Sequence, residues 1–139
     1  MLHDDNNATF RASVKLVCKA GEKILLIRKT GNDYFNLVGG GIDQGESIET
    51  AIQRELFEET GQQREQGEVK LLYAEVKEFS DTTHFDGVLN LFYLLEWENS
   101  FEVKLEEGVY QEYKWVDKAE LSVLAVSEHS NKEFLLGLL

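Results

Sequence analysis

The chain has 139 residues, a formal net charge of −12, 42% hydrophobic residues, one cysteine and no proline. This length predicts a single domain over residues 1–139, and the hydrophobic content excludes a disordered chain. The negative charge argues against binding a nucleic-acid polymer. One cysteine, no signal-peptide pattern and no apolar run of about 18 residues together predict a cytoplasmic protein that does not contact membranes.

The first half of the chain predicts two strands followed by a helix. Residues 1–7 are polar and predict a flexible tail. Alternation over 10–19 predicts a strand with one buried face, which carries Val14, Leu16 and Cys18, and an open face that includes Val17. The apolar run at 24–27 predicts a buried strand that ends at Arg28 and Lys29. After a short extended piece at 34–38, Ser47 as N-cap and Gly61 just past the end delimit a helix at 48–60. Ile48, Ile52 and Leu56 form one stripe of this helix, which is expected to pack on the sheet.

The second half predicts three more strands and two helices. The strands are expected at 69–79, 87–97 and 109–116, and the helices at 118–121, with Asp117 as its cap, and at 128–138. Strands and helices in this order favour an α/β fold, with a mixed sheet between helices on both of its faces.

Three carboxylates, Glu55, Glu58 and Glu59, share about 100° of one face of the helix expected at 48–60. Like charges at these spacings repel, and the negative end of the helix dipole disfavours them further. A bound Mg²⁺ or Mn²⁺ would reverse both effects, because hard cations select carboxylate oxygens. The pattern therefore predicts a divalent-metal site. The alternative, for an isolated Glu-x-x-Glu-Glu, is a solvated surface.

The neighbouring residues favour the metal site. Gly39, Gly40 and Gly41 stand just before the helix, where glycine lets a ligand approach the backbone closely. Arg54 lies about 40° from Glu58 on the helical wheel, so it is expected to pair with the carboxylates and orient them. Glu46 is expected to pair with Arg54 or to anchor the loop.

These residues resemble the box of the Nudix hydrolase family, Gly-x5-Glu-x7-Arg-Glu-U-x-Glu-Glu-x-Gly-U, where U is a bulky aliphatic residue. The final U is Gln62 here, and Val38 replaces a proline that often precedes the box. Looser similarity extends over most of residues 10–122, including Trp115-Val116. The matching residues are Gly40, Glu46, Arg54, Glu55, Leu56, Glu58, Glu59 and Gly61.

The resemblance implies an α/β/α sandwich with a mixed sheet between helices, and hydrolysis of a nucleoside diphosphate linked to another moiety, X. It implies that Glu55, Glu58, Glu59 and the Gly39 carbonyl bind Mg²⁺ or Mn²⁺, which activates water for in-line attack on phosphorus. The base is expected to be Glu59 or a later glutamate. A later glutamate could instead be a further metal ligand, with Glu112 as first choice and Glu107 as second.

Substrate contacts are expected from Gly40, Gly41, Arg28 and Phe35. Arg28 could hold a phosphate and Phe35, or Tyr34, could stack on a base; a solvated strand end and core packing are the respective alternatives. The motifs of the ADP-ribose, diadenosine and coenzyme A branches are missing. A MutT-like nucleoside triphosphate pyrophosphohydrolase therefore remains by elimination.

Several alternatives stay open. They are an ADP-ribose, dinucleoside polyphosphate or nucleotide-sugar hydrolase, and a sensor that binds a nucleotide without hydrolysing it. The chain could be a monomer or a homodimer.

Overall fold

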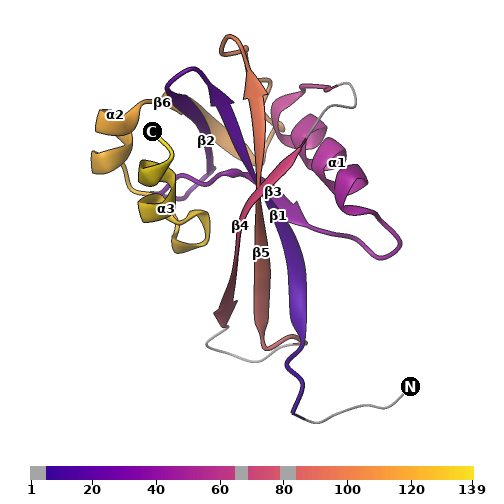
Figure 1. Cartoon of the computed structure of the whole chain (residues 1–139). Coiled ribbons are helices and arrows are strands. Elements are labelled where there is room, and N and C mark those ends of the chain that lie inside the picture. Colours follow the sequence, from indigo (N-terminus) through magenta and orange to yellow (C-terminus); the bar gives the residue numbers. More distant parts are fainter. Residues whose placement is uncertain (1–5, 65–68, 79–83) are drawn as a thin grey trace.

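The computed structural model describes residues 6–64, 69–78 and 84–139 and shows a mixed sheet between helices (Figure 1). The predicted α/β fold is confirmed. None of the helices in these described ranges is long and apolar enough to cross a membrane. In chain order the elements are β1 (Phe10–Ala20), β2 (Lys23–Lys29), β3 (Val38–Gly41), α1 (Ile48–Thr60), β4 (Lys70–Glu78), β5 (Gly87–Trp97), β6 (Tyr110–Val116), α2 (Lys118–Val123), a 3₁₀ turn η1 (Glu128–Ser130) and α3 (Lys132–Gly137).

The sheet has the strand order β4-β5-β1-β2-β6, and β3 pairs with β1 beside this path. β1 and β5 run parallel, whereas the other strand pairs are antiparallel. β1 pairs with β2 only at Lys19 and Ala20, near their hairpin, and farther along it pairs with β3 over Ser13–Leu16. β2 and β1 therefore part, and the segment that leads into β3 lies in the opening, where Asn36 bridges to Ile27.

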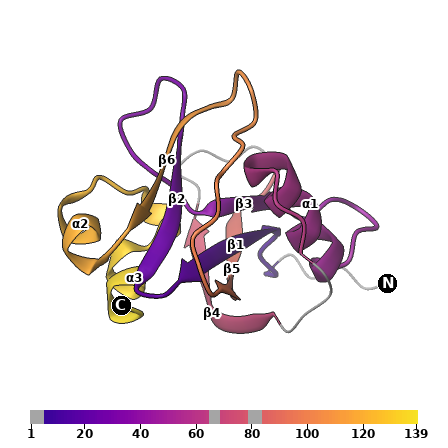
Figure 2. The same cartoon turned by 90° about the horizontal axis from the view of Figure 1, so that it is seen from above.

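Helices cover both faces of the sheet. Figures 1 and 2 show α1 on one side and α2 with α3 on the other. Each side has its own core: Ile52 and Leu56 of α1 pack in the first, and Leu121 of α2 and Leu135 of α3 in the second. β1 contributes to both, so the prediction that only one of its faces is buried is wrong: Val17, expected on the open face, is fully buried.

α1 begins and ends as predicted. The Ser47 side chain accepts a hydrogen bond from the Thr50 backbone N–H, and Gly61 takes a left-handed conformation just past the last turn. The inward stripe differs at its start. Ile48, expected to pack on the sheet, is 41% exposed because the helix reaches the sheet only from its second turn, at Ala51 and Ile52.

The C-terminal region contains two short segments where one helix, 128–138, was predicted. Asn131 interrupts them with a positive φ of 54°, and its side chain accepts a hydrogen bond from the Phe134 backbone N–H, which starts α3. Asn tolerates this conformation better than most residues. The helix expected after Asp117 is present and starts with a capping box between Asp117 and Glu120.

Candidate active site

α1 carries two of the three predicted carboxylates into the protein and leaves the third at the surface. Glu55 and Glu59 are 8% and 4% exposed, whereas 45% of the Glu58 side chain is exposed. The Glu55 carboxylate packs directly against Gly40 of β3, where a β-carbon would lie 2.5 Å from Oε1. A side chain at position 40 would therefore displace the Glu55 carboxylate.

Residues of two strands, β3 and β6, hold the carboxylate of Glu59. The Gly39 backbone N–H donates to its Oε1 at 3.0 Å, and the Tyr110 hydroxyl donates to its Oε2 at 2.7 Å. Burial and the adjacent Glu55 carboxylate raise the pKa of Glu59 to about 8, although the bonds from Tyr110 and Gly39 oppose that shift. Two buried carboxylates this close disfavour joint ionisation, so a cation between them would stabilise the site.

Arg54 links the carboxylates to the loop before the helix. It donates to Glu46 at 2.7 and 2.9 Å, to Glu55 at 2.8 Å, to Glu58 at 3.4 Å and to the Gly41 carbonyl at 3.0 Å. Its bond to Glu46, together with one from the Asp43 backbone N–H, lowers the pKa of Glu46 to about 2. The expected pairing of Arg54 with the carboxylates and with Glu46 is present, and the orienting task of Arg54 stays a prediction.

Glu112 and Arg28 lie away from the carboxylates of α1. They pair with each other across β6 and β2, with Nε of Arg28 3.2 Å from Oε1 of Glu112. The Arg28 guanidinium also lies over the ring of Phe35, which is 4% exposed in the second core, on the α2 and α3 side. The structure therefore does not bring Glu112 to the box, and Phe35 packs in the core, as the alternative to base stacking anticipated.

Glu107, the second choice among the later glutamates, lies closer. It lines a groove of about 390 Å³ together with Glu58, Phe57 and Gly61 of the box region. Gly41, another expected substrate contact, lies under the side chain of Arg11. A β-carbon at position 41 would meet the guanidinium of Arg11, whose side chain is 46% exposed.

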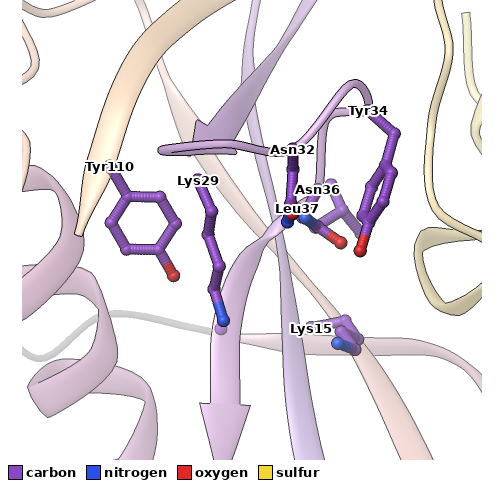
Figure 3. Close-up of a pocket in the computed structure, with 8 residues that line it drawn as sticks. Lys15, Lys29, Asn32, Tyr34, Asn36, Leu37 and Tyr110 are labelled. Atoms are coloured by element: carbon purple, nitrogen blue, oxygen red, sulfur yellow. The ribbon is translucent and has the colours of Figure 1, made fainter.

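A cavity of about 150 Å³ opens beside Gly39, in the gap between β2 and β1. Figure 3 shows Lys29 and Tyr110 next to each other and directed to the same side, with Lys15 on the strand below. Sequence reasoning did not select these residues. The one signal was a lysine at position 15 between the apolar Val14 and Leu16 of a buried strand. The cavity is lined by Lys15, Lys29, Asn32, Tyr34, Asn36, Leu37, Gly39 and Tyr110.

Carboxylates such as those of Glu55, Glu58 and Glu59 are the ligands that a hard divalent cation prefers. In this structure, however, the three do not converge on one point. Within residues 6–64, 69–78 and 84–139, no three carboxylate, histidine or cysteine side chains form a ready-made metal cluster. The reason is visible at Glu58, which turns to Arg54 at the surface while Glu55 and Glu59 lie inside.

Comparison with known proteins identifies the family. The model of the NUDIX domain matches residues 9–137. The chain belongs to the NUDIX family. The Nudix resemblance of the box is thereby confirmed, and with it the assignment to the Nudix hydrolase family.

Curated relatives match less than half of this chain. The RNA pyrophosphohydrolase of Haemophilus ducreyi is 39% identical over 66 residues, which are 47% of this chain and 32% of that protein. The RNA pyrophosphohydrolase of Shewanella denitrificans is 41% identical over 64 residues, 45% of this chain and 36% of that protein. The chain thus spans about a third of the length of these relatives.

Solved structures match almost the whole fold of this NUDIX protein. The E. coli dihydroneopterin triphosphate pyrophosphohydrolase has a TM-score of 0.74 at 21% identity and covers 91% of this chain and 94% of its own. The MutT protein of Methanosarcina mazei Go1 has a TM-score of 0.72 at 20% identity, with 92% and 91% covered. The NUDIX domain of Shewanella oneidensis NrtR, solved with ADP ribose, has a TM-score of 0.72 at 17% identity, with 97% and 90% covered. At these identities the likeness establishes the shared fold.

Proposed function

We propose that this NUDIX protein is a metal-dependent hydrolase of the pyrophosphate linkage in nucleoside diphosphates joined to a moiety X. The most specific form of the proposal is a MutT-like enzyme that cleaves a nucleoside triphosphate to the monophosphate and pyrophosphate. The observation that carries it is the buried pair of Glu55 and Glu59 beside the glycine strand β3. A folded chain tolerates such a pair poorly without a cation, and a cation there would contact phosphates.

The cation, Mg²⁺ or Mn²⁺, would be held by Glu55, Glu58 and Glu59 with the Gly39 carbonyl. Bound there, it supplies neutralisation of phosphate charge and activation of water. Arg54 fixes the orientation of Glu55 through its bond at 2.8 Å and approaches Glu58 at 3.4 Å. Outer residues of this kind commonly change metal affinity or activity by about 10–100-fold.

The proton of the attacking water needs a carboxylate acceptor near the rim of the site. Glu107 fits this place better than Glu112, because Glu107 shares a groove with Glu58, whereas Glu112 pairs with Arg28 on the other face of the sheet. Glu59 is the less suitable base, because both its oxygens already accept hydrogen bonds.

A second candidate substrate is the 5′-triphosphate end of an RNA. The curated relatives that match 66 and 64 residues of this chain are named RNA pyrophosphohydrolase. The net charge of −12 opposes contact with a long polyanion, so we place the free nucleotide first. A sensor without catalysis is disfavoured, because all three box carboxylates are present.

The proposal is tested by incubating the protein with Mg²⁺ or Mn²⁺ and a panel of pyrophosphate compounds. The panel holds nucleoside triphosphates, 8-oxo-dGTP, ADP-ribose, dinucleoside polyphosphates, nucleotide sugars and a 5′-triphosphorylated oligoribonucleotide. Released phosphate is read after coupling to pyrophosphatase or phosphatase. Glu58→Gln is the test variant, and Glu49→Gln is the matched control, since Glu49 is exposed in the first turn of the same helix.

We expect metal-dependent turnover of triphosphates, reduced by about a hundredfold or more in Glu58→Gln and unchanged in Glu49→Gln. Preference for the triphosphorylated oligonucleotide would replace the first substrate by the second. No turnover of any compound, combined with tight nucleotide binding by calorimetry, would refute the hydrolase and favour a sensor.

A further inference from the structure

We propose that Lys15 and Lys29 form a phosphate-binding pair that holds a phosphoryl group of the substrate beside the box carboxylates. The identity of that group as part of a substrate rests on the hydrolase proposed above. The anion site itself is carried by the cavity and its charges, independently of any turnover.

The cavity brings together two cations from separate strands. Lys15 comes from the middle of β1 and Lys29 from the end of β2, and both line the cavity beside Gly39 (Figure 3). Neither ammonium group forms a hydrogen bond or an ion pair with a residue in the described part of the chain. By contrast, Arg54, Glu55, Glu58 and Glu59 of the box each have such a partner.

Two unpaired ammonium groups in one cavity are unfavourable without an anion. Burial lowers the pKa of Lys15, and Lys29 lowers it further, whereas the carboxylates of Glu59 and Glu55 act in the opposite direction. If a cation binds those carboxylates, they no longer balance Lys15. An anion in the cavity would then stabilise both lysines, because a charge-assisted hydrogen bond is about twice as strong as a neutral one.

The size and lining of the cavity select a phosphoryl group over a nucleoside. Its volume of about 150 Å³ is well below the roughly 300–1,000 Å³ of sites that enclose drug-sized molecules. Leu37 is its one aliphatic lining residue, while Asn32 and Asn36 add amide donors. A terminal phosphate, with a charge of about −1.5 to −2 at pH 7, would gain more here than a phosphodiester. The pair therefore favours triphosphates over ADP-ribose and nucleotide sugars.

The direct test measures binding of imidodiphosphate, a pyrophosphate analogue that resists hydrolysis, by calorimetry at a fixed Mg²⁺ concentration. The variants are Lys15→Met and Lys29→Met. Lys23→Met is the control, because Lys23 is exposed at the start of β2 and this substitution removes the same charge as the test variants do. We expect each test variant to weaken binding by about 10-fold or more, and the control to bind as the parent does.

A second measurement separates phosphate binding from mere balancing of the carboxylates. Mn²⁺ affinity, followed by electron paramagnetic resonance, should change little in Lys15→Met, while KM for a triphosphate rises by about 10-fold and kcat falls less. If Lys15 only balances Glu55 and Glu59, Lys15→Met would tighten Mn²⁺ binding and leave imidodiphosphate binding unchanged, and the proposal is overturned.

The two proposals fail in different ways. Absence of turnover with lysine-dependent imidodiphosphate binding would refute the hydrolase and support the anion site. Turnover of triphosphates with unchanged KM and unchanged imidodiphosphate binding in both lysine variants would support the hydrolase and refute the anion site.

Discussion

The packing of Glu55 on Gly40 makes Gly40→Ala the sharpest test of the site geometry. The new methyl group would lie 2.5 Å from Oε1 and 2.8 Å from Cδ of Glu55, whereas ordinary contacts of a β-carbon begin at 3.4 Å. The carboxylate must therefore move by about 0.9 Å, the difference between 3.4 and 2.5 Å. Gly40 does not have a positive φ, so the substitution adds this contact without backbone strain of that kind.

The displacement has a predictable cost. Glu55 cannot swing away freely, because Arg54 holds its Oε1 at 2.8 Å. A misplacement of about 1 Å in a catalytic site can reduce the rate by about 100-fold, which corresponds to roughly 2.7 kcal/mol. We therefore expect kcat/KM to fall by about 100-fold in Gly40→Ala and the affinity for Mn²⁺ to fall by about tenfold or more.

The assay compares Gly40→Ala with Gly137→Ala, which makes the same chemical change in α3, where a β-carbon meets nothing within 4 Å. Mn²⁺ binding is measured by electron paramagnetic resonance, and folding is checked by circular dichroism. Turnover is measured with the substrate of the panel that the parent protein hydrolyses best. If folded Gly40→Ala binds Mn²⁺ and turns over substrate as Gly137→Ala does, the contact between Gly40 and Glu55 does not position a ligand.

Three further predictions address the same region and the core. Arg54→Met and Arg54→Lys should both lower Mn²⁺ affinity by about 10–100-fold, because methionine has no donor and lysine lacks the planar fork whose separate nitrogens contact Glu46 and Glu55; a fully active Arg54→Lys contradicts this. The raised pKa of Glu59, about 8, means that its contribution to the stability of the metal-free protein is fully present below about pH 4.3 and is lost as the pH rises to about 8. Glu59→Gln should thus gain stability relative to the parent over that range in urea titrations with EDTA, and a difference independent of pH speaks against it. Cys18 is fully buried and burial raises its pKa, so a thiol reagent at pH 8 should label it only after unfolding; fast labelling of the native protein disproves this burial.

The parts of the fold that sequence predicted are those set by residues close together in the chain. Ser47, Gly61 and Asp117 terminate helices through bonds within a few residues, so their spacing is sufficient evidence. The grouping of Glu55 with Glu59 follows equally from the geometry of one helix. Ile48 was misassigned because a helical wheel gives the direction of a side chain and not the point at which the helix meets the sheet.

Lys15 escaped prediction for a different reason. Lys15 lies beside Gly39 because β1 pairs with β2 at one end and with β3 farther along. This change of partner leaves an opening in the sheet. No short pattern in the sequence reports which strand replaces another. A lysine inside a buried strand signals a special environment, because buried lysines are rare unless they are paired. It does not say which ligand or residue supplies the pairing.

Tyr110 and Glu112 show how a single backbone irregularity decides the composition of the site. In a regular strand, residues two apart face the same side, so Tyr110 and Glu112 would point together. The register of β2 with β6 shifts between the pairs Arg28–Glu112 and Lys29–Tyr110, and the bulge leaves Gln111 without a register partner in β2. Tyr110 therefore turns to Glu59 on the α1 side, while Glu112 pairs with Arg28 on the other. Glu112, which was expected to complete the site, is thus absent from it, and Tyr110 takes its place by donating a hydrogen bond to Glu59.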